Sequence, residues 1–242
     1  MRVYPSTASV PERLLRVSIA FAKPPDPAVA RGVRLVDGTR TLVSPFVDPP
    51  LWSSDGKVVT LLLDPSRQKL GLAAHRRAGF VLPAGRRVRL LLDGRSRASW
   101  FVRPGGCAPL DASRWHSAPL RAGTREPLVV AFGAPVDALS RDRIAVAAPV
   151  RSRVRGRAPL APGERSWSFV PAMPWRPGVA LAIHPRFEDP CGDEIGEPFE
   201  HAPGAGLAGA RRTTFMPLRF RAPAIGGETT VRRAPRAIRW AP

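Results

Sequence analysis

A segment around Asp64, Arg67, Lys69 and His75 brings together side chains that could do acid–base chemistry. An Asp–His pair can serve as a general base with its orienting group, but catalysis also needs a nucleophile aimed at the same point. No Ser or Cys in a nucleophile-elbow or active-site cysteine pattern accompanies the pair. A hydrolase is therefore the least supported hypothesis. We favour a structural interpretation, in which Asp64 caps a turn and Arg67 pairs with it, and we predict no catalytic residue and no enzymatic activity.

A second segment is acidic and contains Glu188, Asp189, Asp193 and Glu194. Carboxylate oxygens are the hard ligands that Ca²⁺ prefers, and it takes about six to eight of them. The spacing is not that of an EF-hand loop, because no Gly lies between alternating acidic ligands. We favour a tight turn in which Asp189 accepts backbone N–H bonds. These four residues remain the calcium candidate, and otherwise we predict no metal and no cofactor.

Four arginines, Arg151, Arg153, Arg155 and Arg157, alternate with small or apolar residues. If this segment is a strand, the arginines form a one-sided basic stripe that could bind phosphates or an acidic polysaccharide. No aromatic residue lies among them, although recognition of single-stranded nucleic acid usually uses one. We favour a solvated sheet face and keep the stripe as the polyanion-binding candidate.

The two cysteines, Cys107 and Cys191, fit neither a metal-binding nor a CxxC redox pattern. In an oxidising compartment they could form one disulfide, and in the cytosol they would be two thiols. The sequence leaves both states open.

The formal charge of +19 suggests a nucleic-acid partner, but the composition argues otherwise. Three of the 38 basic residues are Lys, there is no Asn, and Arg, Ala, Pro and Gly are abundant. Since these favoured residues have GC-rich codons, we attribute the skew to a GC-rich genome. The basic pI then predicts no more than non-specific, salt-sensitive binding to nucleic acid.

The segments described above are predicted to lie on or between β-strands, and these strands are predicted to form two copies of one domain. Phe, Pro and Asp recur in the same order in 21–26 and 132–137, at an offset of about 111 residues, which is the size of one small domain. Alternating apolar residues in 14–21 and the apolar run 58–63 indicate strands. With 29 Pro and 21 Gly, and no convincing helix of three turns, the chain is predicted to be all-β.

This pattern divides the chain into four parts. Residues 1–104 form the first β-sandwich, with a long loop at 64–82, and residues 124–200 form the second. Residues 105–123 are expected to connect them. The tail, 201–242, is rich in Pro, Gly and Arg and is expected to be weakly ordered, with one possible edge strand at 213–220.

The second unit resembles the bacterial Ig-like domains of S-layer and other surface proteins. The resemblance lies in Phe132 with Pro135 and Asp137, in the segments 167–171 (Trp-Ser-Phe-Val-Pro) and 174–178 (Pro-Trp-Arg-Pro-Gly), and in Asp189-x-x-Gly192. Asp193 stands where that family commonly has Asn. The first unit is similar to a variant of the same module through segment 51–67, which begins Leu-Trp-Ser-Ser-Asp-Gly and ends Leu-Asp-Pro-Ser-Arg.

The resemblance implies two tandem Ig-like antiparallel sandwiches in an exported bacterial protein: periplasmic, on the outer surface, or secreted. No signal peptide follows Met1 and no apolar stretch approaches the ~18 residues of a membrane span, so a cytoplasmic location stays open. The first hypothesis is thus a non-enzymatic module of the cell envelope that acts as a spacer or as a scaffold for a protein or cell-surface glycan.

The alternative hypothesis is a cytosolic protein that binds polyanions such as nucleic acid. It would use the Arg151–Arg157 stripe together with the arginines of the tail, namely Arg211, Arg212, Arg219, Arg221, Arg232, Arg233, Arg236 and Arg239. Such binding would weaken steeply with salt.

Overall fold

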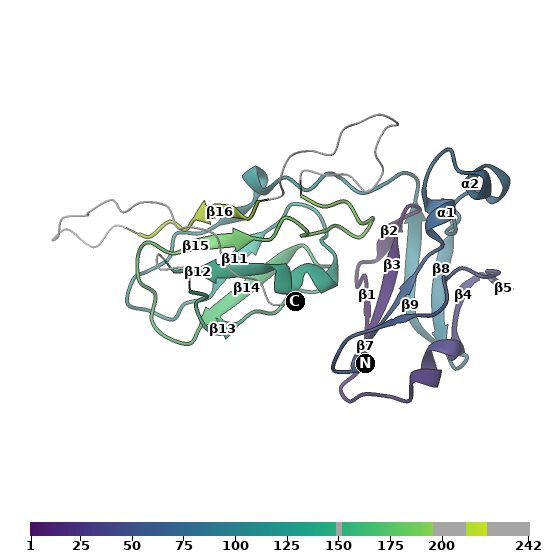
Figure 1. The fold of residues 1–242 in the computed structure, drawn as a ribbon, viewed down its shortest axis with the longest axis horizontal. Helices are drawn as coiled ribbons and strands as arrows, with labels where there is room; N and C mark the ends of the chain where they lie inside the picture. Colours follow the sequence, from purple (N-terminus) through teal and green to yellow (C-terminus); the bar gives the residue numbers. More distant parts are fainter. Residues whose placement is uncertain (149–151, 196–211, 222–242) are drawn as a thin grey trace. The chain divides into compact units, whose positions relative to one another are not determined.

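The computed structural model describes residues 1–148, 152–195 and 212–221, and these residues are almost entirely β. They form 16 strands, two helices of four and six residues, and three 3-10 turns (Figure 1). All strand pairs are antiparallel except one. The all-β prediction is confirmed. Neither helix of the described part has the length or apolar character needed to cross a lipid bilayer.

The chain divides into two compact units, each with its own hydrophobic core. The first unit contains residues 1–108 and two short later segments, 162–164 and 189–193. The second contains, among the described residues, 109–148, 152–161, 165–188, 194–195 and 212–221.

Two sheets make up the first unit. The first has four strands in the order β1-β3-β7-β6. Its bounds are β1 Arg2–Tyr4, β3 Arg16–Ala20, β6 Leu51–Trp52 and β7 Val58–Leu62. The other has five strands in the order β2-β9-β8-β4-β5, and β2 runs parallel to β9. Its bounds are β2 Ser9–Pro11, β4 Val33–Asp37, β5 Arg40–Thr41, β8 Arg87–Leu92 and β9 Arg95–Arg103.

Alternating apolar side chains of the two sheets form one core in this unit. Val17 and Ile19 of β3 and Val88 and Leu90 of β8 are all buried. Trp100 of β9 is 1% exposed, and its Nε1–H donates to the Pro5 carbonyl oxygen at 3.0 Å. A buried indole is stable here because its one polar group has a partner.

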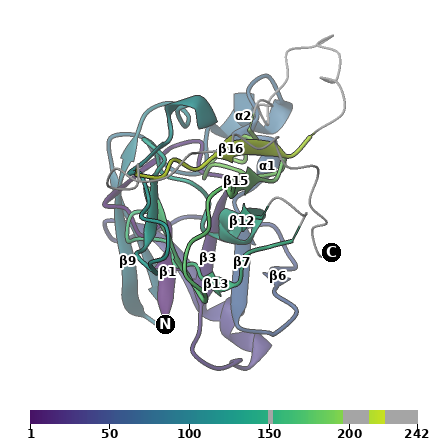
Figure 2. The same ribbon diagram turned by 90° about the vertical axis from the view of Figure 1, so that its left-hand side faces the viewer.

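The second unit also has two sheets. One has the order β10-β11-β14-β13 and the other β12-β15-β16, and β15 and β16 lie side by side in both views (Figures 1 and 2). The bounds of the first sheet are β10 His116–Ser117, β11 Leu128–Ala131, β13 Gly156–Arg157 and β14 Ser166–Pro171. Those of the second are β12 Ile144–Ala147, β15 Ala180–Ile183 and β16 Thr214–Pro217.

The two units repeat one local motif at the predicted offset. Phe21 follows β3 and Phe132 follows β11. Asp26 then caps the 3-10 turn η1 (Pro27–Gly32), and Asp137 caps η3 (Ala138–Arg143), each through a backbone N–H two residues on. Both turns lead directly into a core strand, β4 or β12. An Asp at this position satisfies N–H groups that the turn leaves without partners.

Some boundaries differ from the prediction. The region 109–123, expected to be a connection, belongs to the second unit, where Leu110, Trp115 and Leu120 are buried in its core. Residues 105–123 show little sequence periodicity, but their few large apolar side chains are buried in the core of the second unit. The expected edge strand at 213–220 is observed as the shorter β16, which pairs with β15 and with no other strand of the described residues. The rest of the tail, 201–211 and 222–242, lies outside the described residues.

Candidate functional site

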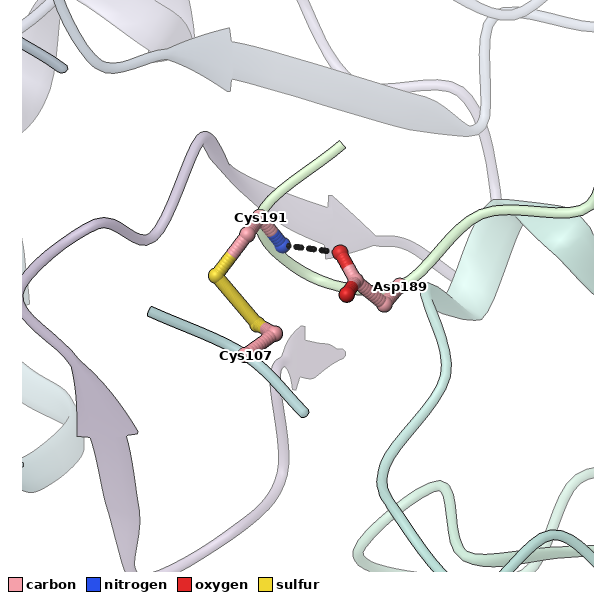
Figure 3. Close-up of side chains that lie close together, drawn as sticks. All are labelled: Cys107, Asp189 and Cys191. Atoms are coloured by element: carbon pink, nitrogen blue, oxygen red, sulfur yellow. Dashed lines mark hydrogen bonds between the residues drawn. A yellow bond between two sulfur atoms is a disulfide. The ribbon is translucent and has the colours of Figure 1, made fainter. Parts of the chain in front are cut away.

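A disulfide joins Cys107, a few residues after β9, to Cys191, which lies 84 residues later in the chain. Their Cα atoms are 5.9 Å apart, and both residues belong to the first unit. Figure 3 shows the bridge beside Asp189, whose carboxylate is turned toward the Cys191 backbone N–H. Of the two states that the sequence left open, the structure has the bonded one.

Asp189 organises the turn that carries Cys191. Its Oδ1 accepts the Cys191 backbone N–H at 2.8 Å and that of Asp193 at 3.0 Å, and its carbonyl accepts the Gly192 N–H at 3.1 Å. The side chain is fully buried. These are the backbone N–H bonds that the tight-turn interpretation predicts. The turn therefore fixes the position of Cys191 for bonding to Cys107.

The proposed calcium ligands are not gathered around a common point in the described residues. Glu188 forms an ion pair with Arg143, whereas the Asp189 carboxylate binds its own turn. Within the part of the chain that the structure covers, Cys107, Asp189 and Cys191 are the one group of three or more potential ligand side chains within 4.8 Å. Both sulfur atoms of this group are already bonded to each other, so neither is a thiolate ligand.

Asp64 and His75 have different partners. Asp64 caps helix α1 (Pro65–Gln68): its Oδ1 accepts the Ser66 N–H at 2.9 Å and the Ser66 hydroxyl at 2.6 Å. His75, in helix α2 (Ala73–Ala78), places Nδ1 2.8 Å from the Arg67 carbonyl oxygen. Asp64 thus caps a turn, as the structural interpretation has it.

The structural interpretation expected Arg67 to pair with Asp64, but the structure shows other partners. Its guanidinium donates to the carbonyl oxygens of Ala78, Gly79 and Phe80, at 3.1, 3.0 and 2.6 Å. These carbonyls lie at the C-terminal end of α2, where a helix leaves acceptors free. Arg67 therefore ties the two short helices together, a role that sequence spacing to Asp64 does not indicate. Lys69 ends α1 as its C-cap residue.

The arginine stripe is exposed but is not a continuous strand. Arg153 takes part in a single bridge with Ala147, and β13 contains only Gly156 and Arg157. Arg153, Arg155 and Arg157 are all exposed, while Val154 between them packs against the core. Arg151 lies outside the described residues. Ser152 and Gly156, which also alternate with these arginines, are exposed as well, so the predicted one-sided pattern is observed only around Val154.

A second cationic region surrounds His184, directly after β15. Partial burial lowers the pKa of His184 below its ordinary value, and the positive charges of Arg143, Arg186 and Arg153 lower it further. Its Nδ1 accepts the Arg186 backbone N–H at 3.1 Å. Both effects favour the neutral imidazole, because protonation would add a charge among cations and remove this acceptor.

The most basic sheet among the described strands was not identified from the sequence. The five strands β2, β4, β5, β8 and β9 contain seven exposed arginines and one acidic residue. The arginines are Arg34, Arg40, Arg87, Arg89, Arg95, Arg97 and Arg103. The acidic residue, Asp37, forms an ion pair with Arg86 at 3.1 Å. This sheet thus carries a large excess of positive charge.

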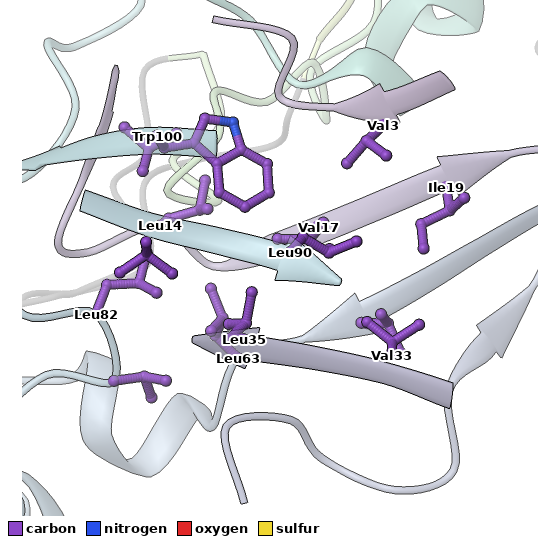
Figure 4. Close-up of a cluster of buried hydrophobic side chains, with 14 of the residues drawn as sticks. Val3, Leu14, Val17, Ile19, Val33, Leu35, Leu63, Leu82, Leu90 and Trp100 are labelled. Atoms are coloured by element: carbon purple, nitrogen blue, oxygen red, sulfur yellow. The ribbon is translucent and has the colours of Figure 1, made fainter. Parts of the chain in front are cut away.

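Strand alternation places four of these arginines on one surface. Leu35, Leu90 and Trp100 point into the core (Figure 4), so their neighbours on β4, β8 and β9 point outward. We call this outward surface the basic sheet face, defined by Arg34, Arg87, Arg89, Phe101 and Arg103. Phe101 lies directly opposite Arg87 in the strand register and is 41% exposed.

A signal for the basic sheet face was present in the sequence. Val88, Leu90 and Leu92 predict a strand with one buried side, and the same alternation puts Arg87 and Arg89 on the other side. The neighbouring strands could not be read in the same way. Which strands flank β8, and in which register, depends on long-range pairing that a single sequence does not display.

Comparison with known proteins adds no family. No known protein family matches the chain, and no curated protein does. Titin domains Z1Z2, solved in complex with telethonin, align at 12% identity over 85% of this chain and 87% of theirs, with a TM-score of 0.24.

Two bacterial pullulanases give similarly distant alignments. Pullulanase type I from Bacillus subtilis, complexed with maltose, aligns at 10% identity over 74% of this chain and 22% of its own, with a TM-score of 0.23. Group B Streptococcus pullulanase SAP aligns at 8% identity over 85% and 25%, with a TM-score of 0.22. The chain spans a quarter or less of either enzyme, and likenesses this weak support no inference about fold or function.

Proposed function

We propose that both units are Ig-like sandwiches and that the protein is an exported, non-enzymatic spacer or binding module of the bacterial cell envelope. The strand order carries this proposal. Ig-like domains pair strands A, B, E and D in one sheet and C, F and G in the other. In chain order, β1-β3-β7-β6 and β10-β11-β14-β13 follow the first pattern, and β4-β8-β9 and β12-β15-β16 follow the second.

The disulfide supports the export part of the proposal. Disulfides form and persist in oxidising compartments such as the bacterial periplasm and the cell surface, and they are rare in the cytosol. Both cysteines of the chain are used in this one bridge, and neither is free. The turn around Asp189 holds Cys191 in a buried position, which suits a permanent structural bond.

Sandwiches of this kind act by presenting surfaces rather than by chemistry. Rigid sheets hold loops and outward faces in place, and these bind a protein or a glycan. The segments considered for catalysis fit this role, because Asp64, Arg67 and His75 bind the backbone of their own loop.

Fractionation of cells that produce the protein naturally tests this proposal. Each fraction is treated with a maleimide reagent before and after reduction. We expect the protein in the periplasmic, surface or secreted fraction, with no thiol labelled until the disulfide is reduced. A cytosolic protein with two thiols labelled before reduction would contradict export.

A further inference from the structure

We infer that the basic sheet face binds an acidic polysaccharide. This inference rests on the proposed function in that it names the ligand class of the proposed binding module. It assigns recognition to Arg87, Phe101 and Arg103 in the first unit, rather than to the stripe at 151–157 or to the tail.

Charge is the first reason. The strands of this sheet carry seven exposed arginines, and their single acidic residue, Asp37, is occupied by Arg86. The hydrogen bonds of Arg34 go to the Arg31 and Val33 carbonyl oxygens, and Arg89 donates to that of Gly38. These bonds to neutral acceptors leave the positive charges uncompensated. Arginine guanidinium groups bind carboxylates and sulfates through paired hydrogen bonds, which makes a polyanion the complementary partner.

The arrangement of the face is the second reason. Arg87 lies opposite Phe101, and Arg103 lies two residues beyond Phe101 on the same side of β9. Residues two apart on a strand are separated by about 6.5 Å, and adjacent strands by about 4.8 Å. The exposed Phe101 ring therefore has Arg87 on one side and Arg103 on another, each close enough to contact a single sugar residue that lies on the ring. The apolar face of a sugar can cover the ring while its acidic group reaches an arginine.

Other polyanions fit this surface less well. The major groove of duplex DNA admits a helix or a two-stranded ribbon, not the flat face of a five-stranded sheet. Proteins that bind single strands on a sheet use several aromatic side chains as stacking platforms, and among the strand residues of this sheet Phe101 is the one exposed aromatic. Membrane surfaces are typically bound by several exposed large apolar side chains beside the cations.

The test measures binding of the full chain to polygalacturonate, with dextran as the neutral polymer and oligo-dT as the nucleic acid. One variant combines Arg87→Gln and Arg103→Gln, and a second carries Phe101→Ser. The matched control, Arg155→Gln with Arg157→Gln, removes the same charge from exposed positions of the second unit. All substituted side chains are exposed, and circular dichroism checks that each variant is folded.

We expect polygalacturonate to bind and dextran not to bind. The Arg87/Arg103 variant should bind about tenfold more weakly, the loss expected for removing direct ionic contacts. Phe101→Ser should also weaken binding by several-fold, and the control by less than about twofold. The inference is overturned if polygalacturonate does not bind or if the control loses as much as the Arg87/Arg103 variant. It is also overturned if oligo-dT binds more tightly than polygalacturonate.

These outcomes are separate from the test of export. A cytosolic location would contradict the envelope proposal and would leave the binding measurement unchanged. Absent or non-selective binding would remove the basic sheet face and would leave location and the state of the disulfide as they are.

Discussion

The sheet β4-β8-β9 of the first unit and the sheet β12-β15-β16 of the second have the same strand order. The side chains that point away from the main core are charged and exposed in the first sheet and small and buried in the second. On β8, the outward-pointing Arg87 and Arg89 are exposed. On β15, the side chains that point away from the main core are Ala180 and Ala182, and both are buried. Charge is therefore not spread evenly over equivalent positions of the two units.

This difference shows that the number of arginines in the chain and their location on the surface are separate questions, which net charge alone does not distinguish. A GC-rich genome, which we infer from the composition, would explain how many arginines the chain has, but composition does not determine where they lie. In the first unit many of them lie on the outward side of one sheet, where the side chains are exposed to solvent. The second unit uses the corresponding side for small apolar residues, such as Ala147 and Ala182, which pack with Phe215. Two copies of one strand order can thus be given different tasks by their outward residues.

The largest expected effect comes from placing an arginine on the buried face of the second unit, compared with placing an alanine on the exposed face of the first. Ala182→Arg places an unpaired charge at a position that is 0% exposed, so the free energy of unfolding of the second unit should fall by about 3–5 kcal/mol. Arg89→Ala, at an exposed outward position of β8, should change the stability of the first unit by less than about 1 kcal/mol. Chemical denaturation followed by tryptophan fluorescence measures both. Equal effects would show that the two faces do not differ in burial.

Removing the disulfide should affect the first unit. Replacing both cysteines, Cys107→Ser with Cys191→Ser, should lower the free energy of unfolding of that unit by about 2–5 kcal/mol, because the denatured chain gains freedom. Calorimetry of the wild type and the double variant measures the loss. An unchanged transition for the first unit would mean that the bridge contributes nothing to its stability.

Acid should destabilise the second unit through His184. Since the pKa of His184 is lowered in the folded protein, the unfolded chain binds the proton more readily. The stabilisation is complete above pH ~6.5 and is lost as the pH falls from there toward the lowered pKa of the folded state. His184→Gln should flatten the dependence of the unfolding free energy on pH between 7 and 5.

Urea denaturation of the wild type and of His184→Gln at several pH values between 7 and 5 measures this dependence. A slope that is the same in the His184 variant as in the wild type would contradict the role assigned to that side chain.

The smallest effect is expected for the residues assigned to ligand binding. Arg87→Gln with Arg103→Gln should shift the free energy of unfolding by no more than about 0.5 kcal/mol, since both side chains are exposed and lie on the solvent side of the sheet. Thermal denaturation provides the measurement. A loss above about 2 kcal/mol would mean that these arginines stabilise the fold, and they would then be poor probes of binding.

Much of the fold could be predicted from the sequence because its signals are local. Alternation identified the strand that became β3, and the recurrence of Phe21 and Asp26 as Phe132 and Asp137 marked equivalent turns in the two units. The region 109–123 could not be assigned in this way. Leu110, Trp115 and Leu120 lie five residues apart, which matches neither the period of a strand nor that of a helix, and their burial depends on a core made by distant strands.

The candidate sites were less predictable, because they depend on which distant segments meet. The turn at Asp189 follows from local hydrogen bonds, whereas the pairing of Cys107 with Cys191 joins positions 84 residues apart. The basic sheet face requires the register of three strands: Arg87 comes opposite Phe101 only through the pairing of β8 with β9. Single-strand patterns show one row of such a face at a time.

An NMR titration of the isotope-labelled protein with polygalacturonate tests the contrast between the two sheets most directly. We expect chemical-shift changes in β8 and β9, around Arg87, Phe101 and Arg103, and no change in β12 or β15. Shift changes centred on Ala180–Ile183 or on Arg153–Arg157, or no change anywhere, would contradict it.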